Sequence, residues 1–192
     1  MGGVSARIEY VSVDVEASGP VPGAFSMLSL GATIVTMARG EPPRIGASYY
    51  TELQPLAGAG ADETALAYAG GLRPENLVAT GQPPAEALRG LNDFLSREGV
   101  RRPVFVAHCA SFDWMFVAWY YSHTGIPNPF GYAALDTKAL AMGRLRLGWR
   151  ETGTELLARR LGIPRQDPRT VHHAGHDAAW QATLLIALLT TE

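Results

Sequence analysis

The stretch YVSVDVEASGP, Tyr10–Pro20, decides the fold of this chain. It belongs to a run over residues 6–17 whose valines and aromatic residue predict a strand, with two acids, Asp14 and Glu16, near its end. Residues i and i+2 of a strand point to the same side, so we expect both carboxylates on one face. Like charges repel there and are costly to remove from water. The pattern therefore calls for a compensating cation.

The segments that follow predict a mixed α/β fold. Residues 25–37 and 46–55 read as two more strands, and the Gly- and Pro-containing links between the three strands indicate an antiparallel meander. Strands alternating with helices come next, which predicts parallel pairing in the same sheet. We expect a short strand at Val104–Ala107, a strand that runs into a helix at Asp136 or Thr137, and helices over 62–72, 83–99, 111–124, 152–161 and 173–190. The 152–161 helix carries a capping-box pattern, Thr152 with Glu155. No linker or repeat divides the chain, so a single domain over residues 1–192 is expected.

Composition narrows the classes of partner and compartment. The 192 residues are 47% hydrophobic and carry a formal net charge of −2, which is typical of a soluble protein without a strong basic field. This argues against tight non-specific duplex binding, but not against short or single-stranded nucleic acids. The chain has one cysteine, no recognisable signal peptide and no apolar run long enough to span a bilayer. We therefore expect a cytoplasmic protein that does not enter membranes.

Several acids stand among Val, Phe, Trp and Ala rather than among charged neighbours. They are Asp14, Glu16, Asp113, Asp136 and Asp177. A buried acid needs a cation or a metal, and Arg7 is the only lysine or arginine within ten residues of any of the first three. Carboxylate ligands suit Mg²⁺ or Mn²⁺ better than zinc, and two such ions about 3.5–4 Å apart serve phosphodiester cleavage. Asp136 is expected to cap the helix that follows it.

A histidine could take the proton of an attacking water, and the segment TVHHAGHD, residues 170–177, offers three. On a continuous helix, His173 shares a face with Asp177, four residues later. His172 is five residues from Asp177 and can converge on the same site only from a loop before the helix. Spacing alone leaves both arrangements open.

Three motifs occur in order along the chain: DVEASG at Asp14–Gly19, HCASFD at His108–Asp113, and HHAGHDA at His172–Ala178. Together with the Asp136-Thr137 step, they resemble the motifs of the DnaQ-like (DEDDh) 3′–5′ exonucleases, and the resemblance covers nearly the whole chain. It implies a ribonuclease-H-like fold and a metal-dependent 3′–5′ exonuclease that releases nucleoside monophosphates. It further implies two Mg²⁺ or Mn²⁺ ions held by the four acids of the motifs, Asp14, Glu16, Asp113 and Asp177, with His172 as the base.

The chain departs from the family pattern at two places. Cys109 replaces the usual Asn, and Ala17-Ser18 replaces the usual pair of threonines, so contacts through that amide and the first hydroxyl are lost. The hypothesis for the terminal nucleotide is that it is held by small residues and apolar side chains near the acids: Ala17, Ser18, Phe112, with Met27 wedged against the base and His108 touching substrate or orienting its loop. The predicted partners are DNA or RNA 3′ ends, single-stranded or short. The oligomeric state is open, and a homodimer is one alternative.

Other interpretations compete with this one. A non-catalytic nucleic-acid or protein-binding module on the same fold would be expected to lack one of the acids or His172, and none is missing. A zinc site built from the third-motif histidines with His108 or Cys109 has poor spacing and leaves the acids unexplained. Single acids could be ordinary caps or surface residues, which does not account for all of them together. An arginine-rich stretch in the last third is by default a solvated face, or else a rim that follows a nucleic-acid backbone: Arg144, Arg146, Arg150, Arg159, Arg160, Arg165 and Arg169.

Overall fold

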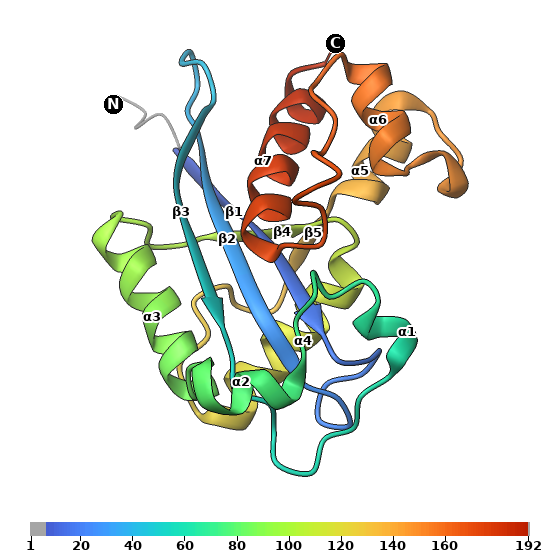
Figure 1. Ribbon diagram of the computed structural model, residues 1–192. Helices are drawn as coiled ribbons and strands as arrows, with labels where there is room; N and C mark the ends of the chain where they lie inside the picture. The colour runs from blue at the N-terminus through green and yellow to red at the C-terminus, as the bar shows by residue number, and fades with distance from the viewer. Residues whose placement is uncertain (1–6, 192) are drawn as a thin grey trace.

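A computed structural model describes residues 7–191, and its core is a five-stranded sheet in the order β3-β2-β1-β4-β5 (Figure 1). The first three strands pair antiparallel, and β4 and β5 then add in parallel beside β1. The bounds are β1 Ile8–Ala17, β2 Met27–Met37, β3 Arg44–Glu52, β4 Val104–Ala107 and β5 Ala134–Asp136. The predicted mixed sheet is confirmed; the expected start of the first strand at Ala6 lies outside the described residues.

Helices cover both faces of the sheet. They are α1 Glu63–Leu66, α2 Pro74–Thr80, α3 Pro84–Arg97, α4 Ala110–Thr124, α5 Thr137–Leu145, α6 Thr154–Leu161 and α7 Ala174–Thr190, with a short 3-10 helix η1 Trp149–Glu151 between α5 and α6. Helix α7 packs on one face against β1 and β2, whereas α3 and α4 pack on the other (Figure 1). Among the described residues, no helix is long and apolar enough to cross a membrane.

The alternation along β1 places the acids on the α7 side. Val11, Val13 and Val15 are buried in the hydrophobic core beneath α3 and α4. Asp14 and Glu16 alternate with these valines, so their side chains emerge on the opposite face of the sheet. The valines thus anchor the strand, and the acids are held at its carboxyl end under the start of α7.

Two local predictions were wrong. The expected helix over 62–72 is only the short α1, because the chain then turns through Gly70 and Gly71, both with positive φ. The expected capping box does not form, since α6 begins at Thr154 with Gly153 as its N-cap. The hydroxyl of Thr152 instead donates to the carbonyl of Trp149 at 2.7 Å and closes η1.

Candidate active site

The four motif acids meet in one pocket of about 330 Å³ between the end of β1, the start of α4 and the start of α7. Its lining consists of Asp14, Val15, Glu16, Tyr68, His108, Cys109, Phe112, Asp113, His172 and Asp177. These residues come from segments up to 163 positions apart in the chain, so only the tertiary fold assembles the pocket. The structure therefore brings together all four predicted acids, His172, His108 and Phe112.

Hydrogen bonds fix Asp14 of β1 and Asp113 of α4. One carboxylate oxygen of Asp113 accepts the backbone N–H of Val15 at 3.0 Å, which ties the first turn of α4 to β1. Asp14 accepts a hydrogen bond at 2.7 Å from the side-chain amide of Gln181. The oxygen of that amide accepts the backbone N–H of His108 at 3.1 Å, so Gln181 joins two of the three motifs.

Gln181 is a residue that the sequence reasoning missed. It is 4% exposed and stands in the long apolar helix α7, where a polar side chain needs a specific partner. It also follows Asp177 by four residues, which places both on one face of the helix. That spacing was the available signal.

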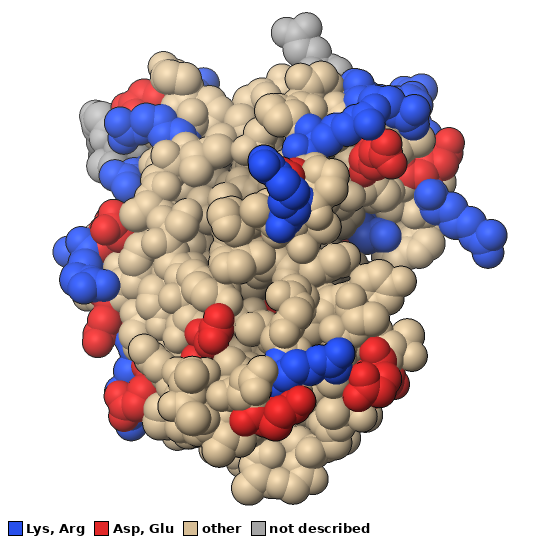
Figure 2. Space-filling model, viewed as in Figure 1, with Lys and Arg blue, Asp and Glu red and all other residues tan. Residues whose placement is uncertain are grey.

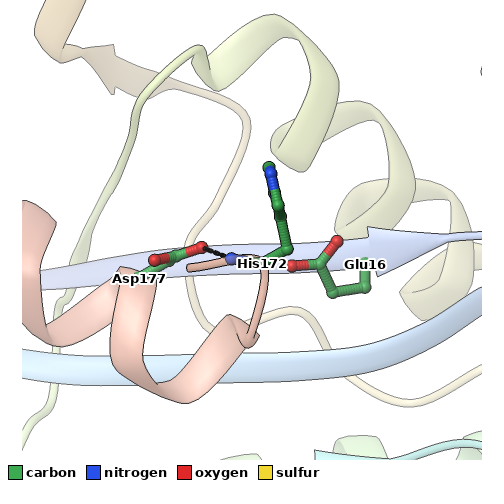
Figure 3. Close-up of side chains that lie close together, drawn as sticks. All are labelled: Glu16, His172 and Asp177. Atoms are coloured by element: carbon green, nitrogen blue, oxygen red, sulfur yellow. Dashed lines mark hydrogen bonds between the residues drawn. The ribbon is translucent and has the colours of Figure 1, made fainter. Parts of the chain in front are cut away.

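The loop before α7 settles the histidine geometry that spacing left open. His173 is the N-cap of α7, and His172 precedes it with a φ of 65°, in the left-handed region. The backbone N–H of His172 donates to a carboxylate oxygen of Asp177 at 2.8 Å, and the side-chain amide of Gln166 donates to the other oxygen at 2.8 Å. Figure 3 shows the ring of His172 rising from this loop between Asp177 and Glu16. A ring nitrogen of His172 and one oxygen of each carboxylate lie within 4.8 Å of one another.

Two glycines allow this loop to approach the sheet so closely. A Cβ at Gly31 in β2 would collide with the backbone of Ala174, the first residue of α7. A Cβ at Gly70, on the loop after α1, would collide with the carbonyl of His172. The absence of side chains at these two positions lets the start of α7 lie directly over the acids of β1.

The acids are buried together and repel one another. Burial, followed by the charges of neighbouring acids, raises the pKa of Asp14 well above its usual range and that of Glu16 to about 8. Burial also raises the pKa of Asp113 to about 7 and raises that of Asp177. Within residues 7–191, no lysine or arginine forms an ion pair with any of the four. A hard divalent cation would supply the missing positive charge, and oxygen donors are the ligands such an ion prefers.

His108 and Asp136 support the loop that carries the second motif. A ring nitrogen of His108 pairs with the hydroxyl of Thr137 at 2.7 Å, and burial together with the charge of Lys138 lowers the pKa of His108 to about 4. Asp136 caps α5 as predicted, accepting the backbone N–H of Ala139 at 2.7 Å, and also accepts that of Ala110 at 2.8 Å. His108 is thus a neutral, fixed residue at the pocket edge.

Three of the residues predicted to hold substrate do not line the pocket. Met27 is fully buried in the core, because the pairing of β1 with β2 shifts register after Glu16 and sets Met27 opposite Ala17 on the α4 side. Ala17 is 7% exposed and belongs to the same core. The hydroxyl of Ser18 donates to the carbonyl of Gly60 at 2.9 Å and so fastens a loop. The predicted wedge by Met27 is therefore corrected.

Aromatic rings occupy the rim instead. Tyr68, which sequence reasoning missed, is 61% exposed and meets His172 edge to face, with 5.3 Å between ring centroids. Phe112 is 36% exposed at the start of α4, and the thiol of Cys109 pairs with the hydroxyl of Ser111 at 3.0 Å. Other rings of α4 are buried in the core, namely Phe116, Tyr120 and Tyr121.

Comparison with known proteins agrees with this geometry. Residues 9–189 match the family described as the Rv2179c-like 3′-5′ exoribonuclease domain. The chain belongs to this family. It is 34% identical over 177 residues to the 3′-5′ DNA exonuclease Cap18 of Escherichia coli, covering 91% of this chain and 88% of Cap18. It is 30% identical over 190 residues to ribonuclease T of Hahella chejuensis, covering 93% of this chain and 82% of that relative.

Solved structures share the fold of this Rv2179c-like chain. The nuclease domain of 3′hExo, a DEDDh family member bound to rAMP, superposes with a TM-score of 0.74 at 11% identity, covering 98% of this chain and 94% of that domain. E. coli exonuclease I in complex with a dT13 oligonucleotide gives a TM-score of 0.69 at 17% identity, over 95% of this chain and 40% of that one. The fold is therefore that of the ribonuclease-H-like DEDDh exonucleases.

The family membership decides the class of protein. The Rv2179c-like chain is a 3′–5′ exonuclease that depends on a divalent metal, as the motifs predicted. The alternative of a non-catalytic binding module has no support among these relatives. Nucleic acid is its substrate.

Proposed function

We propose that Asp14, Glu16, Asp113 and Asp177 hold two Mg²⁺ or Mn²⁺ ions and that the chain removes nucleoside monophosphates one at a time from 3′ ends. The observation that carries this proposal is the convergence of four buried acids with raised pKa values on one pocket, where no lysine or arginine of residues 7–191 forms an ion pair with them. Such an arrangement is unstable by itself and becomes favourable when divalent charge is added.

His172 is the proposed general base. Bound ions would lower the pKa of a water and stabilise the leaving oxygen of the phosphodiester. The ring of His172 lies beside Glu16 and Asp177, at the edge of the carboxylate cluster, where imidazole can accept a proton from such a water. The φ of 65° and the hydrogen bond from its backbone to Asp177 hold the ring in this place.

The same ring could instead be a metal ligand, because its nitrogen lies within 4.8 Å of two carboxylate oxygens. The two roles predict different results for His172→Ala. Loss of a base lowers kcat and leaves the affinity for Mn²⁺ unchanged, whereas loss of a ligand weakens Mn²⁺ binding as much as Asp177→Asn does. Isothermal titration with Mn²⁺ alongside single-turnover kinetics separates them.

We propose single-stranded or short DNA and RNA ends as substrates. A pocket of about 330 Å³ is at the small end of ligand sites, which suits one nucleotide. Tyr68 and Phe112 offer exposed rings beside the acids, and rings of this kind stack bases with little regard to sequence. The family is described as exoribonuclease and the relative Cap18 as a DNA exonuclease, which favours neither sugar alone.

The test is a digestion of matched 5′-labelled DNA, RNA and dinucleotide substrates with Mg²⁺, with Mn²⁺ and with EDTA. A ladder of products that shortens from the 3′ end and requires metal supports the proposal. Folded protein that degrades no DNA or RNA end in either metal contradicts it.

We also propose that a single exonuclease domain accounts for residues 1–192 and that the protein acts in the cytoplasm, where its unpaired Cys109 would stay reduced.

A further inference from the structure

Positive charge is concentrated in one segment of the chain. Residues 138–176 contain eight lysines and arginines against three acids, a net charge of +5, so the rest of the chain carries −7. This segment forms α5, η1, α6 and the loop that leads to α7, here called the α5–α6 lobe. Figure 2 shows blue Lys and Arg side chains gathered over the α5–α6 lobe, at the upper right. A protein with a formal charge of −2 thus presents one strongly basic surface.

The α5–α6 lobe is joined to the active site at two points. Thr137, next to Lys138 at the start of α5, hydrogen-bonds the ring of His108, and the backbone of Thr152 bonds the same ring. On the other side, the amide of Gln166 donates to Asp177 at 2.8 Å. One end of the lobe thus contacts the second motif and the other contacts the third, so the lobe lies next to the catalytic pocket, which it lines through His172.

The α5–α6 lobe itself contains a hollow. It has a volume of about 320 Å³ and is lined by Thr154, Glu155, Arg165, Gln166, Pro168 and Val171. Gln166 is shared, since it lines the hollow and also touches Asp177. Gln166 therefore connects the catalytic site with this hollow.

Several side chains of the lobe have the properties of a single-strand binding surface. The ring of Trp149 is 55% exposed, with the ammonium of Lys138 4.7 Å from its centroid. The guanidinium groups of Arg165 and Arg169 are paired with acids. Among the described residues, no ion pair engages the exposed arginines Arg146, Arg150, Arg159 and Arg160. An exposed indole among unpaired cations can stack a base and hold phosphates at the same time.

We propose that the α5–α6 lobe binds the nucleotides that lie 5′ to the one being removed, with Trp149 stacking a base and the unpaired arginines contacting phosphates. The substrate class that fits is a single strand of several nucleotides rather than a dinucleotide. This inference rests on the proposed function, because it assigns a binding surface to the same site.

The test uses the double variant Arg159→Gln/Arg160→Gln and the single variant Trp149→Ala. The matched control is Arg97→Gln/Arg102→Gln, which removes two exposed arginines outside the lobe that form no ion pair within residues 7–191. For a single strand of about 12 nucleotides, we expect KM to rise about tenfold in the lobe variants and to stay unchanged in the control. A dinucleotide has only one nucleotide 5′ to the one removed, so its KM should change much less than that of the longer strand, and an unchanged kcat on it shows that the variants are folded.

A binding measurement tests the surface independently of cleavage. Fluorescence anisotropy in EDTA, at several salt concentrations, gives the slope of log K against log salt. Each lost phosphate contact lowers the magnitude of this slope by about 0.7 for single strands, so the arginine double variant should lose about 1.4. Equal slopes and equal KM values in lobe and control variants would overturn the proposal. That result is expected if the lobe is a solvated face or a surface that binds an acidic protein. Wild-type protein that cleaves neither substrate would contradict the proposed function, while the slopes would still decide on the surface.

Discussion

The substitution Glu16→Gln should stabilise the metal-free enzyme at pH 8 while removing its activity. Glu16 is 8% exposed, and its pKa is raised from 4.5 to about 8 in the folded protein. Between these two values the folded state binds more protons than the unfolded state, so the free energy of unfolding falls as the pH rises. Ionisation of Glu16 alone lowers the free energy of unfolding by about 5 kcal/mol when the whole pKa shift is counted, at 1.36 kcal/mol for each unit of pKa. Gln carries no charge and does not incur this cost.

The assay is thermal unfolding in EDTA between pH 4.5 and pH 8. Relief of even half of the cost raises Tm by about 5–10 °C in a chain of this length. The difference should nearly vanish near pH 4.5, where Glu16 is protonated in the folded state and about half protonated in the unfolded state. Saturating Mn²⁺ should reverse the order, because the wild type then gains a charge interaction that Gln cannot make. Glu41→Gln, an exposed acid in the β2–β3 turn, is the control. Parallel pH profiles of wild type and Glu16→Gln would refute the reasoning.

Three further comparisons test the geometry around the acids. His172→Ala should lower kcat by about 10²–10⁴ with little effect on Tm, whereas His173→Ala should cost about 1 kcal/mol of stability through the lost N-cap and keep most activity; equal losses of activity would undo the assignment of the base. Gln181→Leu should weaken Mn²⁺ binding about 10–100-fold in isothermal titration, and unchanged affinity would show that the amide does not position its carboxylate. Gly31→Ala should destabilise the fold by about 1–3 kcal/mol in urea unfolding and reduce activity by displacing the start of α7, while Gly143→Ala, with open space around it, should do neither; similar effects at both sites would refute the close approach.

Local patterns in the sequence determined much of the secondary structure of this protein. The strand Tyr10–Ala17 was readable because alternation with period 2 buries the valines and leaves Asp14 and Glu16 on one face. The mixed sheet, the end of α4 at Thr124 and the cap at Asp136 were predicted from the strand patterns, the helix pattern and the residue type at position 136. The motif acids were recognisable because charged residues in apolar surroundings need a partner, and no partner stands close in the sequence.

Only the tertiary structure decided which side chains share the pocket. His172 reaches the acids because a left-handed residue before α7 turns its ring inward, a conformation that neither propensity nor spacing specifies. Met27 was misplaced because a register shift between β1 and β2 turns it into the core. Gln181 and Tyr68 were missed because their partners lie more than 70 residues away in the chain, and such contacts are set by the packing of α7 and of the loop after α1. The sequence by itself thus determined the strands and the chemistry of the acids, while the packing of distant elements determined which groups hold and flank them.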